Sequence, residues 1–240
     1  MLGLPDQIDA TLFDLDGVIT QTATVHRAAW KETFDDFLRA RDPAQFVPFS
    51  NLDYARYVDG KPREAGTRDF LASRSISLSD NDIAALSARK NQLVLAKIKA
   101  GDVKVFPNSV TYLHRARADG FRTAIVSSSE NCRAVLESAG LLDLFDVRID
   151  GAVAKEEGLA GKPAPDTFLA AARKLGVEPE RAAVFEDALA GVAAGRAGHF
   201  GIVIGVNRTN QAAELKAHGA DIVVDDLGDL LTDGREDPHA

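Results

Sequence analysis

The sequence has few of the residues on which several common binding sites depend. It contains a single cysteine, Cys132, so it cannot form an intramolecular disulfide, and we expect a reducing compartment. Its five histidines are scattered along the chain, and no cysteine–histidine group has the spacing of a zinc site. No glycine-rich nucleotide-binding loop follows a predicted strand. Zinc proteins, disulfide-stabilised proteins and nucleotide-binding modules therefore match this sequence poorly.

Positive charge and long apolar runs are also scarce. The chain has 28 basic and 36 acidic side chains and a net charge of −8 at pH 7, which argues against nucleic acid and anionic membranes as partners. No apolar run reaches the roughly 18–20 residues of a membrane helix, and the first residues lack the basic start and apolar stretch of a signal peptide. We therefore expect a cytoplasmic protein. We also expect a monomer whose partner is a small molecule, although charge and hydropathy do not decide the oligomeric state.

What the chain does contain is a regular alternation of short β-branched runs with amphipathic helical patterns. This alternation predicts an α/β fold: a three-layer, Rossmann-like core in which helices cover both faces of a parallel sheet. The predicted strands cover residues 8–13, 122–126, 182–185, 202–206 and 222–224. The helical patterns that accompany the last four strands centre on residues 110–118, 133–139, 167–175 and 189–197.

One long helical stretch interrupts this alternation. Between residues 24 and 41 the bulky apolar side chains recur at the spacing of an amphipathic helix, and the last clear helix of the stretch covers residues 84–98. No strand pattern occurs between them. We therefore expect a helical cap domain at residues 22–101, inserted into a core domain that consists of residues 1–21 and 102–240.

Four carboxylates directly follow predicted strands. Asp14 and Asp16 come after the first strand, and Glu186 and Asp187 come after the third. An open parallel sheet binds its ligands outside the carboxyl ends of its strands, so we expect these groups to lie close together. Carboxylates this close repel one another unless a cation separates them, and Mg²⁺ prefers oxygen ligands. The sequence therefore predicts a magnesium site at this edge of the sheet.

Two further groups near this edge suit a phosphoryl group. Lys162 precedes a predicted helix, and Ser127 begins a run of three serines after the second strand. An ammonium and the backbone N–H groups of such a turn, together with the ion, would bind a dianionic phosphoryl group.

Four motifs in order resemble those of the haloacid dehalogenase superfamily, and their wording is most similar to the β-phosphoglucomutase subfamily. A lone Asp-x-Asp would be weak evidence, whereas four ordered motifs are specific. The resemblance extends from about residue 8 to residue 206 and includes the cap. The motifs occupy residues 13–19 (FDLDGVI), 126–129 (VSSS), 161–166 (GKPAPD) and 185–191 (FEDALAG).

This resemblance implies a phosphotransferase that uses an aspartyl-phosphate intermediate. Asp14 would be the nucleophile and Asp16 the general acid and base, with the backbone carbonyl of Asp16 facing the metal. Dehalogenases lack the second aspartate, so Asp16 argues against cleavage of a carbon–halogen bond. The remaining implied roles are metal binding by Asp14, Asp16, Glu186 and Asp187, and stabilisation of the phosphoryl oxygens by Lys162 and Ser127.

The resemblance also implies substrate-binding residues in the cap and in the serine loop. Thr22 and His26 would position Asp16, Arg63 would bind the phosphate that is not transferred, and Lys90 would reach into the site. From the residues alone, His26 and Trp30 also suit the interior of a helical domain, and Arg63 and Lys90 also suit a solvated surface. The full implied set is Thr22, His26, Trp30, Gly60, Arg63, Lys90, Ser128, Ser129 and Asn131.

Two positions depart from the subfamily pattern, which usually has lysine at both. This chain has Asp59 in the cap loop and Glu130 after the serines. Both substitutions lower the positive potential expected around the second phosphate of a sugar bisphosphate. They favour a phosphatase, whereas Thr22, His26, Arg63 and Lys90 favour a mutase.

Two functions therefore remain open. The first is a β-phosphoglucomutase, which interconverts β-glucose 1-phosphate and glucose 6-phosphate. The alternative is a sugar-phosphate phosphatase of the same family, in which water attacks the aspartyl phosphate. A phosphorylated signalling receiver fits poorly, because Asp14 follows the first strand and a long helical insertion comes after it.

Overall fold

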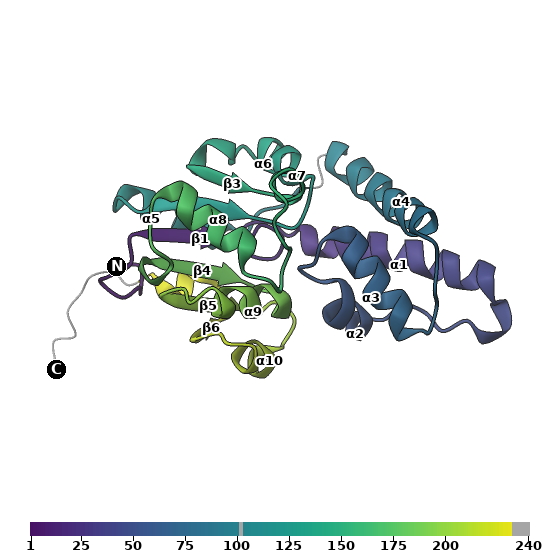
Figure 1. The fold of residues 1–240 in the computed structure, drawn as a ribbon. Coiled ribbons are helices and arrows are strands. Elements are labelled where there is room, and N and C mark those ends of the chain that lie inside the picture. The colour runs from purple at the N-terminus through teal and green to yellow at the C-terminus, as the bar shows by residue number, and fades with distance from the viewer. Residues whose placement is uncertain (101–102, 232–240) are drawn as a thin grey trace.

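The computed structural model describes residues 1–100 and 103–231 and confirms the α/β fold class (Figure 1). A six-stranded sheet has the order β3-β2-β1-β4-β5-β6, and every neighbouring pair is parallel. The strands are β1 (Ala10–Phe13), β2 (Arg122–Val126), β3 (Val147–Ile149), β4 (Ala182–Glu186), β5 (Ile202–Val206) and β6 (Ile222–Val224).

The register of the central strand explains why distant polar residues meet at one edge. Phe13 of β1 lies opposite Ile125 of β2 and Phe185 of β4. The residues that follow these three positions therefore emerge together at the carboxyl end of the sheet. Asp14 and Glu186 are such residues, and both are buried.

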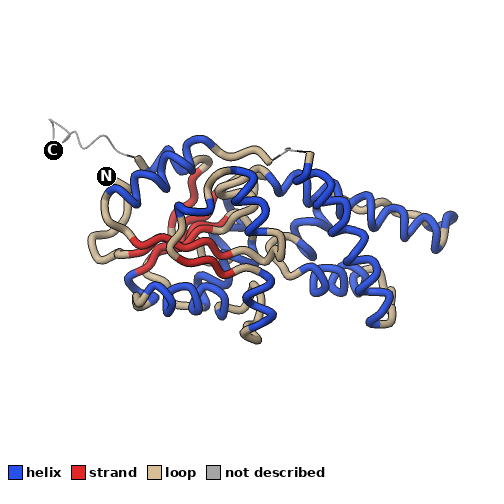
Figure 2. The backbone as a smooth tube through the Cα atoms, turned by 90° about the horizontal axis from the view of Figure 1, so that it is seen from above, coloured by secondary structure: helices blue, strands red, loops and turns tan. Residues whose placement is uncertain are grey.

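Alternate residues of the strands face two separate apolar layers. Ala10 and Leu12 of β1 pack in the cluster that includes α8 and α9, whereas Phe13 packs in the cluster that includes α5 and α6. Figure 2 shows helices on both sides of the strands, as a three-layer core requires. These helices are α5 (Pro107–Ala118), α6 (Cys132–Ala139), α8 (Asp166–Leu175), α9 (Leu189–Ala197) and α10 (Ala212–Ala217).

The strand prediction missed β3 and the short helix α7 (Gly151–Glu156) that follows it. Only three residues of β3 pair with β2, and Asp146 and Asp150 flank them. So short a run at a sheet edge gives no clear apolar signal, and the pairing with β2 is what defines the strand. Short 3₁₀ turns occupy Pro43–Gln45, Leu142–Leu144, Pro179–Arg181 and Leu227–Leu230.

The predicted helical insertion forms a separate packed unit beside the sheet (Figure 1). We call residues 22–100 the helical unit. Phe34 is fully buried at its centre, with ring centroids of Trp30 at 4.9 Å and of Phe70 at 4.2 Å. The predicted domain boundary at residues 101 and 102 lies outside the described residues. The unit contains α1 (Thr22–Arg41), α2 (Asn51–Asp53), a π-helical turn (Tyr54–Val58), α3 (Arg63–Ser73) and α4 (Asp80–Lys99).

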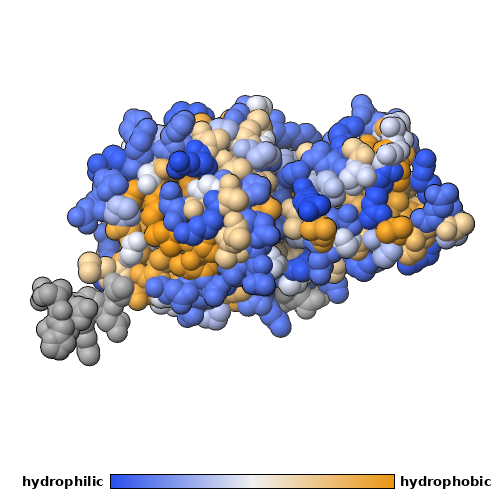
Figure 3. All heavy atoms as spheres, turned by 90° about the horizontal axis from the view of Figure 1, so that it is seen from below, coloured by the Kyte–Doolittle hydropathy of each residue, from blue (hydrophilic) through white to orange (hydrophobic). Residues whose placement is uncertain are grey.

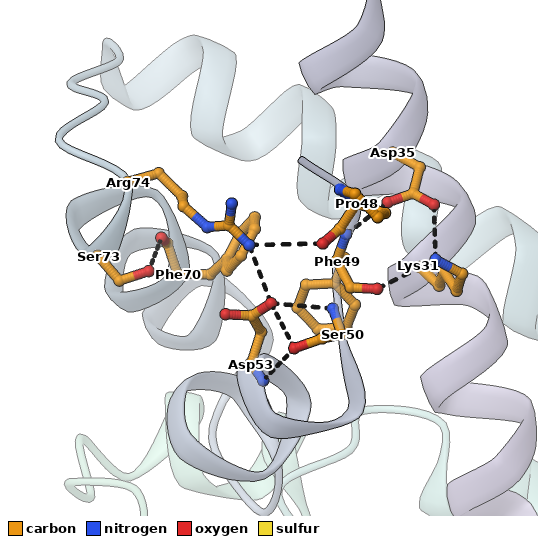
Figure 4. Close-up of polar contacts among 9 residues, drawn as sticks. All are labelled: Lys31, Asp35, Pro48, Phe49, Ser50, Asp53, Phe70, Ser73 and Arg74. Carbon is orange, nitrogen blue, oxygen red and sulfur yellow. Dashed lines mark hydrogen bonds and ion pairs between the residues drawn. The ribbon is translucent and has the colours of Figure 1, made fainter. Parts of the chain in front are cut away.

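A polar network fixes the loop that connects α1 to α2 (Figure 4). The buried Asp35 accepts hydrogen bonds from the backbone N–H of Phe49 at 2.7 Å and from Lys31 Nζ at 2.8 Å. Asp53 accepts a hydrogen bond from Arg74 Nη2 at 2.9 Å, which ties α2 to the end of α3. The network thereby positions the segment that continues from α2 towards the core.

The two chain segments that connect the helical unit to the core lie side by side. The backbone N–H of Gln21 donates to Lys104 O at 2.8 Å, and that of Phe106 donates to Ile19 O at 2.9 Å. The chain therefore enters and leaves the unit at adjacent positions, which is the arrangement that a hinge requires.

Polar residues dominate one face of the molecule (Figure 3). Figure 3 shows hydrophilic residues over most of one face, with a group of hydrophobic residues over the α/β core. Among the described residues, no helix combines the length and the apolar character needed to cross a membrane.

Candidate active site

A cavity of about 350 Å³ lies between the carboxyl edge of the sheet and the helical unit. Both parts line it, and several contacts join them across it. Ser128 Oγ donates to Gly60 O at 2.7 Å, and Asn131 Nδ2 donates to Asn91 Oδ1 at 2.8 Å.

Three of the predicted site residues, Thr22, Lys162 and Glu186, do not line the cavity. Each of them is hydrogen-bonded to a residue that does: Thr22 to Asp16, Lys162 to Asp14, and Glu186 to the backbone N–H of Ala188.

Three buried carboxylates form a cluster at the base of the cavity. Oxygen atoms of Asp14, Glu186 and Asp187 lie within 4.8 Å of one another. Lys162 Nζ donates to Asp14 Oδ1 at 2.6 Å, to Glu186 Oε1 at 2.5 Å and to the Val126 carbonyl at 3.0 Å. The lysine therefore orients two of the three carboxylates.

The cluster holds more negative than positive charge. Burial raises the pKa of Asp14 well above its usual range, with Lys162 opposing that shift. Burial and the neighbouring carboxylates, Asp59 first among them, also raise the pKa of Asp187 well above its usual range. The pKa of Lys162 lies above its usual value because Asp14 and Glu186 outweigh the effect of its burial. One ammonium does not neutralise three carboxylates, so the site has the charge and donor set of a cation site.

Two glycines make room for this cluster. A Cβ atom on Gly17 would lie 1.8 Å from Asp187 Oδ2, and one on Gly191 would lie 1.7 Å from Glu186 Oε1. Gly17 also has a φ of +97°, a conformation that other residues rarely adopt. Both glycines belong to the motifs noted in the sequence, and the structure supplies the steric reason for them.

The side chain of Asp16 occupies a different environment from the three clustered carboxylates. Its Oδ1 accepts a short hydrogen bond from Thr22 Oγ1, and Thr20 Oγ1 lies 2.6 Å from Thr22 Oγ1. His26 Nε2 lies 3.7 Å from the same Asp16 oxygen. Thr22 thus contacts Asp16, and His26 faces it. That these two residues position Asp16 for catalysis, and that Asp16 contacts a metal through its carbonyl, stay predictions.

His26 connects Asp16 to the helix α4. Its Nδ1 lies 3.0 Å from Lys90 Nζ, and burial together with Lys90 lowers the pKa of His26 to about 4. A neutral imidazole that accepts from Lys90 at Nδ1 carries its proton on Nε2, which faces Asp16. Trp30 packs in the apolar core of the helical unit and also lines the cavity, with Lys90 Nζ 4.9 Å from its ring centroid.

The charge on Lys90 is expected to make the stability of the protein depend on pH. Burial lowers its pKa to about 7 from the usual 10.5. Between these values the unfolded chain binds more protons than the folded one, so wild-type stability rises with pH across this window. Lys90→Met is expected to be more stable than wild type near pH 7 and to lose this advantage towards pH 10.

Urea unfolding of both proteins at several pH values measures this difference. Lys97→Met is the matched control, because Lys97 lies on the same helix and is exposed. The prediction would be contradicted if the free energies of unfolding of Lys90→Met and wild type differed by the same amount from pH 7 to pH 10.

The serine loop contributes side chains to the cavity wall and shapes its own turn. Ser127 Oγ accepts from the backbone N–H of Ser129 at 3.1 Å, and Ser129 Oγ accepts from that of Asn131 at 3.2 Å. Ser127 is buried and its hydroxyl can still donate, so it suits an oxygen acceptor in the cavity. Binding of a phosphoryl oxygen by Ser127 stays a prediction.

Both residues that depart from the subfamily pattern line the cavity. Asp59 accepts a hydrogen bond from the buried Tyr54, and burial raises the pKa of Asp59 to about 7. Glu130 Oε2 accepts from Arg63 Nη2 at 2.6 Å. The structure therefore pairs Arg63, expected to bind a phosphate, with a carboxylate of the protein itself.

Several cavity residues carried no recognisable signal in the sequence. Tyr54, Lys155 and Thr167 line the cavity, and Thr167 Oγ1 is buried without a hydrogen-bond partner among the described residues. Lys155 lies on α7, which the sequence patterns did not predict. Tyr54 belongs to none of the sequence motifs, and only its contact with Asp59 in the structure identifies it as a residue of the site.

The segment after β5 was also missed, and it supports the site from outside the cavity. Arg208 Nε donates to the Gly17 carbonyl at 2.8 Å, and Gln211 Nε2 donates to the Asp187 carbonyl at 2.8 Å. The Arg208 guanidinium also lies 3.6 Å from the ring centroid of Phe106, in the second connection to the helical unit. These contacts hold two motifs of the site in place.

Comparisons with known proteins agree with the geometry. A family model described as haloacid dehalogenase-like hydrolase matches residues 8–199. A beta-phosphoglucomutase from Mycobacterium tuberculosis is 49% identical over 247 residues, which cover 96% of this chain and 94% of that protein. The crystal structure of a beta-phosphoglucomutase from Clostridium difficile is similar with a TM-score of 0.78 and 27% identity, and the match covers 93% of each chain.

A further solved structure is relevant to the choice between the two candidate functions. A mutant of CbbY from Rhodobacter sphaeroides, in complex with xylulose-(1,5)bisphosphate, is similar with a TM-score of 0.72 and 25% identity. The match covers 92% of this chain and 95% of that one. The similarity to all these proteins thus extends over both the core and the helical unit.

Proposed function

The chain belongs to the haloacid dehalogenase-like hydrolase family and is an enzyme, and we propose that it interconverts β-glucose 1-phosphate and glucose 6-phosphate through a phosphorylated aspartate. The observation that carries this proposal is the position of Asp14 within a buried carboxylate cluster, held by Lys162 and close to a second carboxylate, Asp16. The name of the mycobacterial relative supports glucose as the sugar.

Asp14 is the proposed nucleophile. Lys162 orients its carboxylate through the hydrogen bond to Oδ1. A bond forms from this carboxylate to phosphorus as the bond from phosphorus to the leaving oxygen breaks, and Asp16 gives that oxygen a proton. In the second half-reaction a sugar hydroxyl attacks the aspartyl phosphate and Asp16 takes its proton. Thr22 holds Asp16 by its hydrogen bond, and the neutral His26 faces it.

Mg²⁺ is the proposed ion. Asp14, Glu186 and Asp187 would hold it, with the Asp16 carbonyl as a further ligand, since these oxygen donors suit a hard divalent cation. The space that Gly17 and Gly191 leave for the carboxylates fits this assignment. Mg²⁺ bound here would neutralise charge on the phosphoryl group.

The helical unit is the proposed cap domain, with residues 22–101 inserted between residues 1–21 and 102–240. Its own apolar core and its paired connections support movement as one body. Closure over the site would exclude water from the aspartyl phosphate and favour the sugar hydroxyl as acceptor.

A pair of assays on the purified enzyme tests the mutase proposal. The enzyme is primed with glucose 1,6-bisphosphate and given β-glucose 1-phosphate, and glucose 6-phosphate and free phosphate are measured in parallel. We expect glucose 6-phosphate to form much faster than free phosphate. Free phosphate as the main product would overturn the mutase and support the phosphatase.

The phosphatase remains the second candidate because of Asp59 and Glu130. Both place negative charge in the cavity where the subfamily pattern usually has lysine. The similarity to CbbY in complex with a pentulose bisphosphate adds xylulose 1,5-bisphosphate as a substrate for the free-phosphate assay.

Metal binding is expected to stabilise the protein through Asp187. Asp187→Ala removes a buried carboxylate that its neighbours repel, so it should raise the melting temperature of the metal-free protein. It should also abolish the increase that Mg²⁺ causes in wild type and lower turnover by about 100-fold or more.

Thermal melts with chelator and with a Mg²⁺ titration measure both effects. Asp143→Ala is the control, because Asp143 is exposed and makes no hydrogen bond or ion pair among the described residues. An equal Mg²⁺-dependent increase in wild type and Asp187→Ala would show that the ion binds elsewhere.

A further inference from the structure

One part of the cavity wall contains an internal ion pair. Arg63, the first residue of α3, donates from Nη2 to Glu130 Oε2 at 2.6 Å. Arg63 Nε also faces the interior, where it is buried without a hydrogen-bond partner among the described residues. The arginine is thus only partly satisfied by Glu130 and keeps a donor for a ligand.

The other cations that line the cavity are occupied. Lys61 Nζ donates to Asp69 at 2.6 Å, and Lys90 contacts His26 at 3.0 Å. Lys162 does not line the cavity and is held in the carboxylate cluster. Lys155 differs from all of these: its side chain is exposed to the cavity, and it makes no hydrogen bond or ion pair among the described residues.

Lys155 and Glu130 belong to adjoining parts of the wall. The N-terminus of α7 packs against the serine loop, where the Gly151 N–H donates to Ser129 O at 3.2 Å. A Cβ on Gly151 would lie 2.9 Å from the backbone nitrogen of Glu130, so this contact requires a glycine. Lys155 follows Gly151 by four residues and therefore lies one turn along the same face of the helix.

We propose that Lys155 and Glu130 determine the selectivity of this part of the cavity: Lys155 binds the phosphate of the phosphosugar that is not transferred, and Glu130 competes with that phosphate for Arg63. This inference rests on the proposed function, because it assumes a substrate with a phosphate far from Asp14. Lys155 supplies a positive charge in place of the lysine that the subfamily pattern usually has at position 130.

The pairing of charges explains why both residues are needed. A lysine ammonium without a partner attracts any anion. An arginine that is already hydrogen-bonded to a carboxylate exchanges that carboxylate only for a stronger hydrogen-bond acceptor. A phosphate dianion that reaches both Lys155 and Arg63 satisfies this condition, and a neutral sugar end does not. Glu130 therefore lowers the affinity for a second phosphate by competing for Arg63, and Lys155, which pairs with no carboxylate among the described residues, offsets this loss.

Steady-state kinetics of Lys155→Met and Glu130→Gln test the inference. The probes are β-glucose 1-phosphate with the bisphosphate primer, and acetyl phosphate, which has no second phosphate for Lys155 to bind. Lys155→Met is expected to raise KM for glucose 1-phosphate about tenfold with little change in kcat, and to alter the KM for acetyl phosphate much less. Glu130→Gln is expected to lower the same KM several-fold.

Two control variants show whether the change in KM is caused by the loss of positive charge at residue 155. Lys155→Arg keeps the charge and should retain a KM within about twofold of wild type. Lys216→Met removes an exposed lysine from the last turn of α10, outside the cavity, and should behave as wild type. Circular dichroism of each variant confirms that it is folded.

The outcomes separate this inference from the proposed function. An unchanged KM in Lys155→Met overturns the inference even if wild type converts glucose 1-phosphate efficiently. A wild type that forms no glucose 6-phosphate overturns the mutase instead. In that case phosphate release from glucose 1,6-bisphosphate replaces the mutase assay, and an equal KM in wild type and Lys155→Met overturns the inference there as well.

Discussion

Asp14→Asn is expected to abolish phosphoryl transfer and to leave the fold intact. The amide keeps the shape of the carboxylate but is a far poorer nucleophile. Because burial raises the pKa of Asp14 well above its usual range, loss of the charge should not destabilise the protein. Intact-mass spectrometry of wild type incubated with acetyl phosphate and Mg²⁺ should show one added phosphoryl group, and the variant should show none.

The matched control for this experiment is Asp143→Asn, an isosteric change at an exposed aspartate outside the cavity. It should be phosphorylated and active as wild type. Transfer at the wild-type rate in Asp14→Asn, or a phosphoryl group that peptide mapping locates on another residue, would show that Asp14 is not the nucleophile. Thermal melts of all three proteins establish that loss of activity is not loss of folding.

Asp16→Asn is expected to lower turnover of sugar phosphates by about 10²–10⁴-fold, because it removes the proton donor and acceptor. The asparagine can still accept a hydrogen bond from Thr22 and keeps its backbone carbonyl, so metal binding should change little. The loss should be much smaller for a substrate such as p-nitrophenyl phosphate, whose leaving group needs no proton.

Comparing the two substrates distinguishes the loss of acid–base catalysis from a distortion of the active site. A variant that merely distorts the site would lose activity on both substrates to the same extent. An equal loss on both would therefore contradict the role of Asp16 as acid and base. The Mg²⁺-dependent increase in melting temperature, measured in parallel, checks that the metal site is retained.

Much of the core could be predicted because its signals are local. The apolar run that ends at Phe13 and the carboxylates that follow it are adjacent in the chain, and a parallel sheet brings the ends of its strands to one edge. The α/β fold class, the family and the enzymatic nature of the chain are confirmed. The same reasoning placed Glu186 and Lys162 near Asp14, where the structure has them.

Features that depend on long-range packing could not be predicted. The strand β3 has three residues and is defined by its pairing with β2, so the helix α7 and Lys155 had no expected position. Asp59 and Glu130 were recognised as departures in charge, but their partners were not. Tyr54 binds Asp59, and Arg63 binds Glu130 across 67 positions of the chain.

The sequence by itself determined the alternation of strands and helices apart from β3, α7 and α10, the motifs at the strand ends, and the presence of a helical stretch between the first two predicted strands. These follow from residue periodicity and from residues that are neighbours in the chain. Only the tertiary structure decided which charges meet across the cavity, which lysine of its wall has no partner among the described residues, and how Asp16 is separated from the carboxylate cluster. Those properties depend on how the helical unit packs against the core, and ion pairs and burial between distant segments have no periodic signature in the sequence.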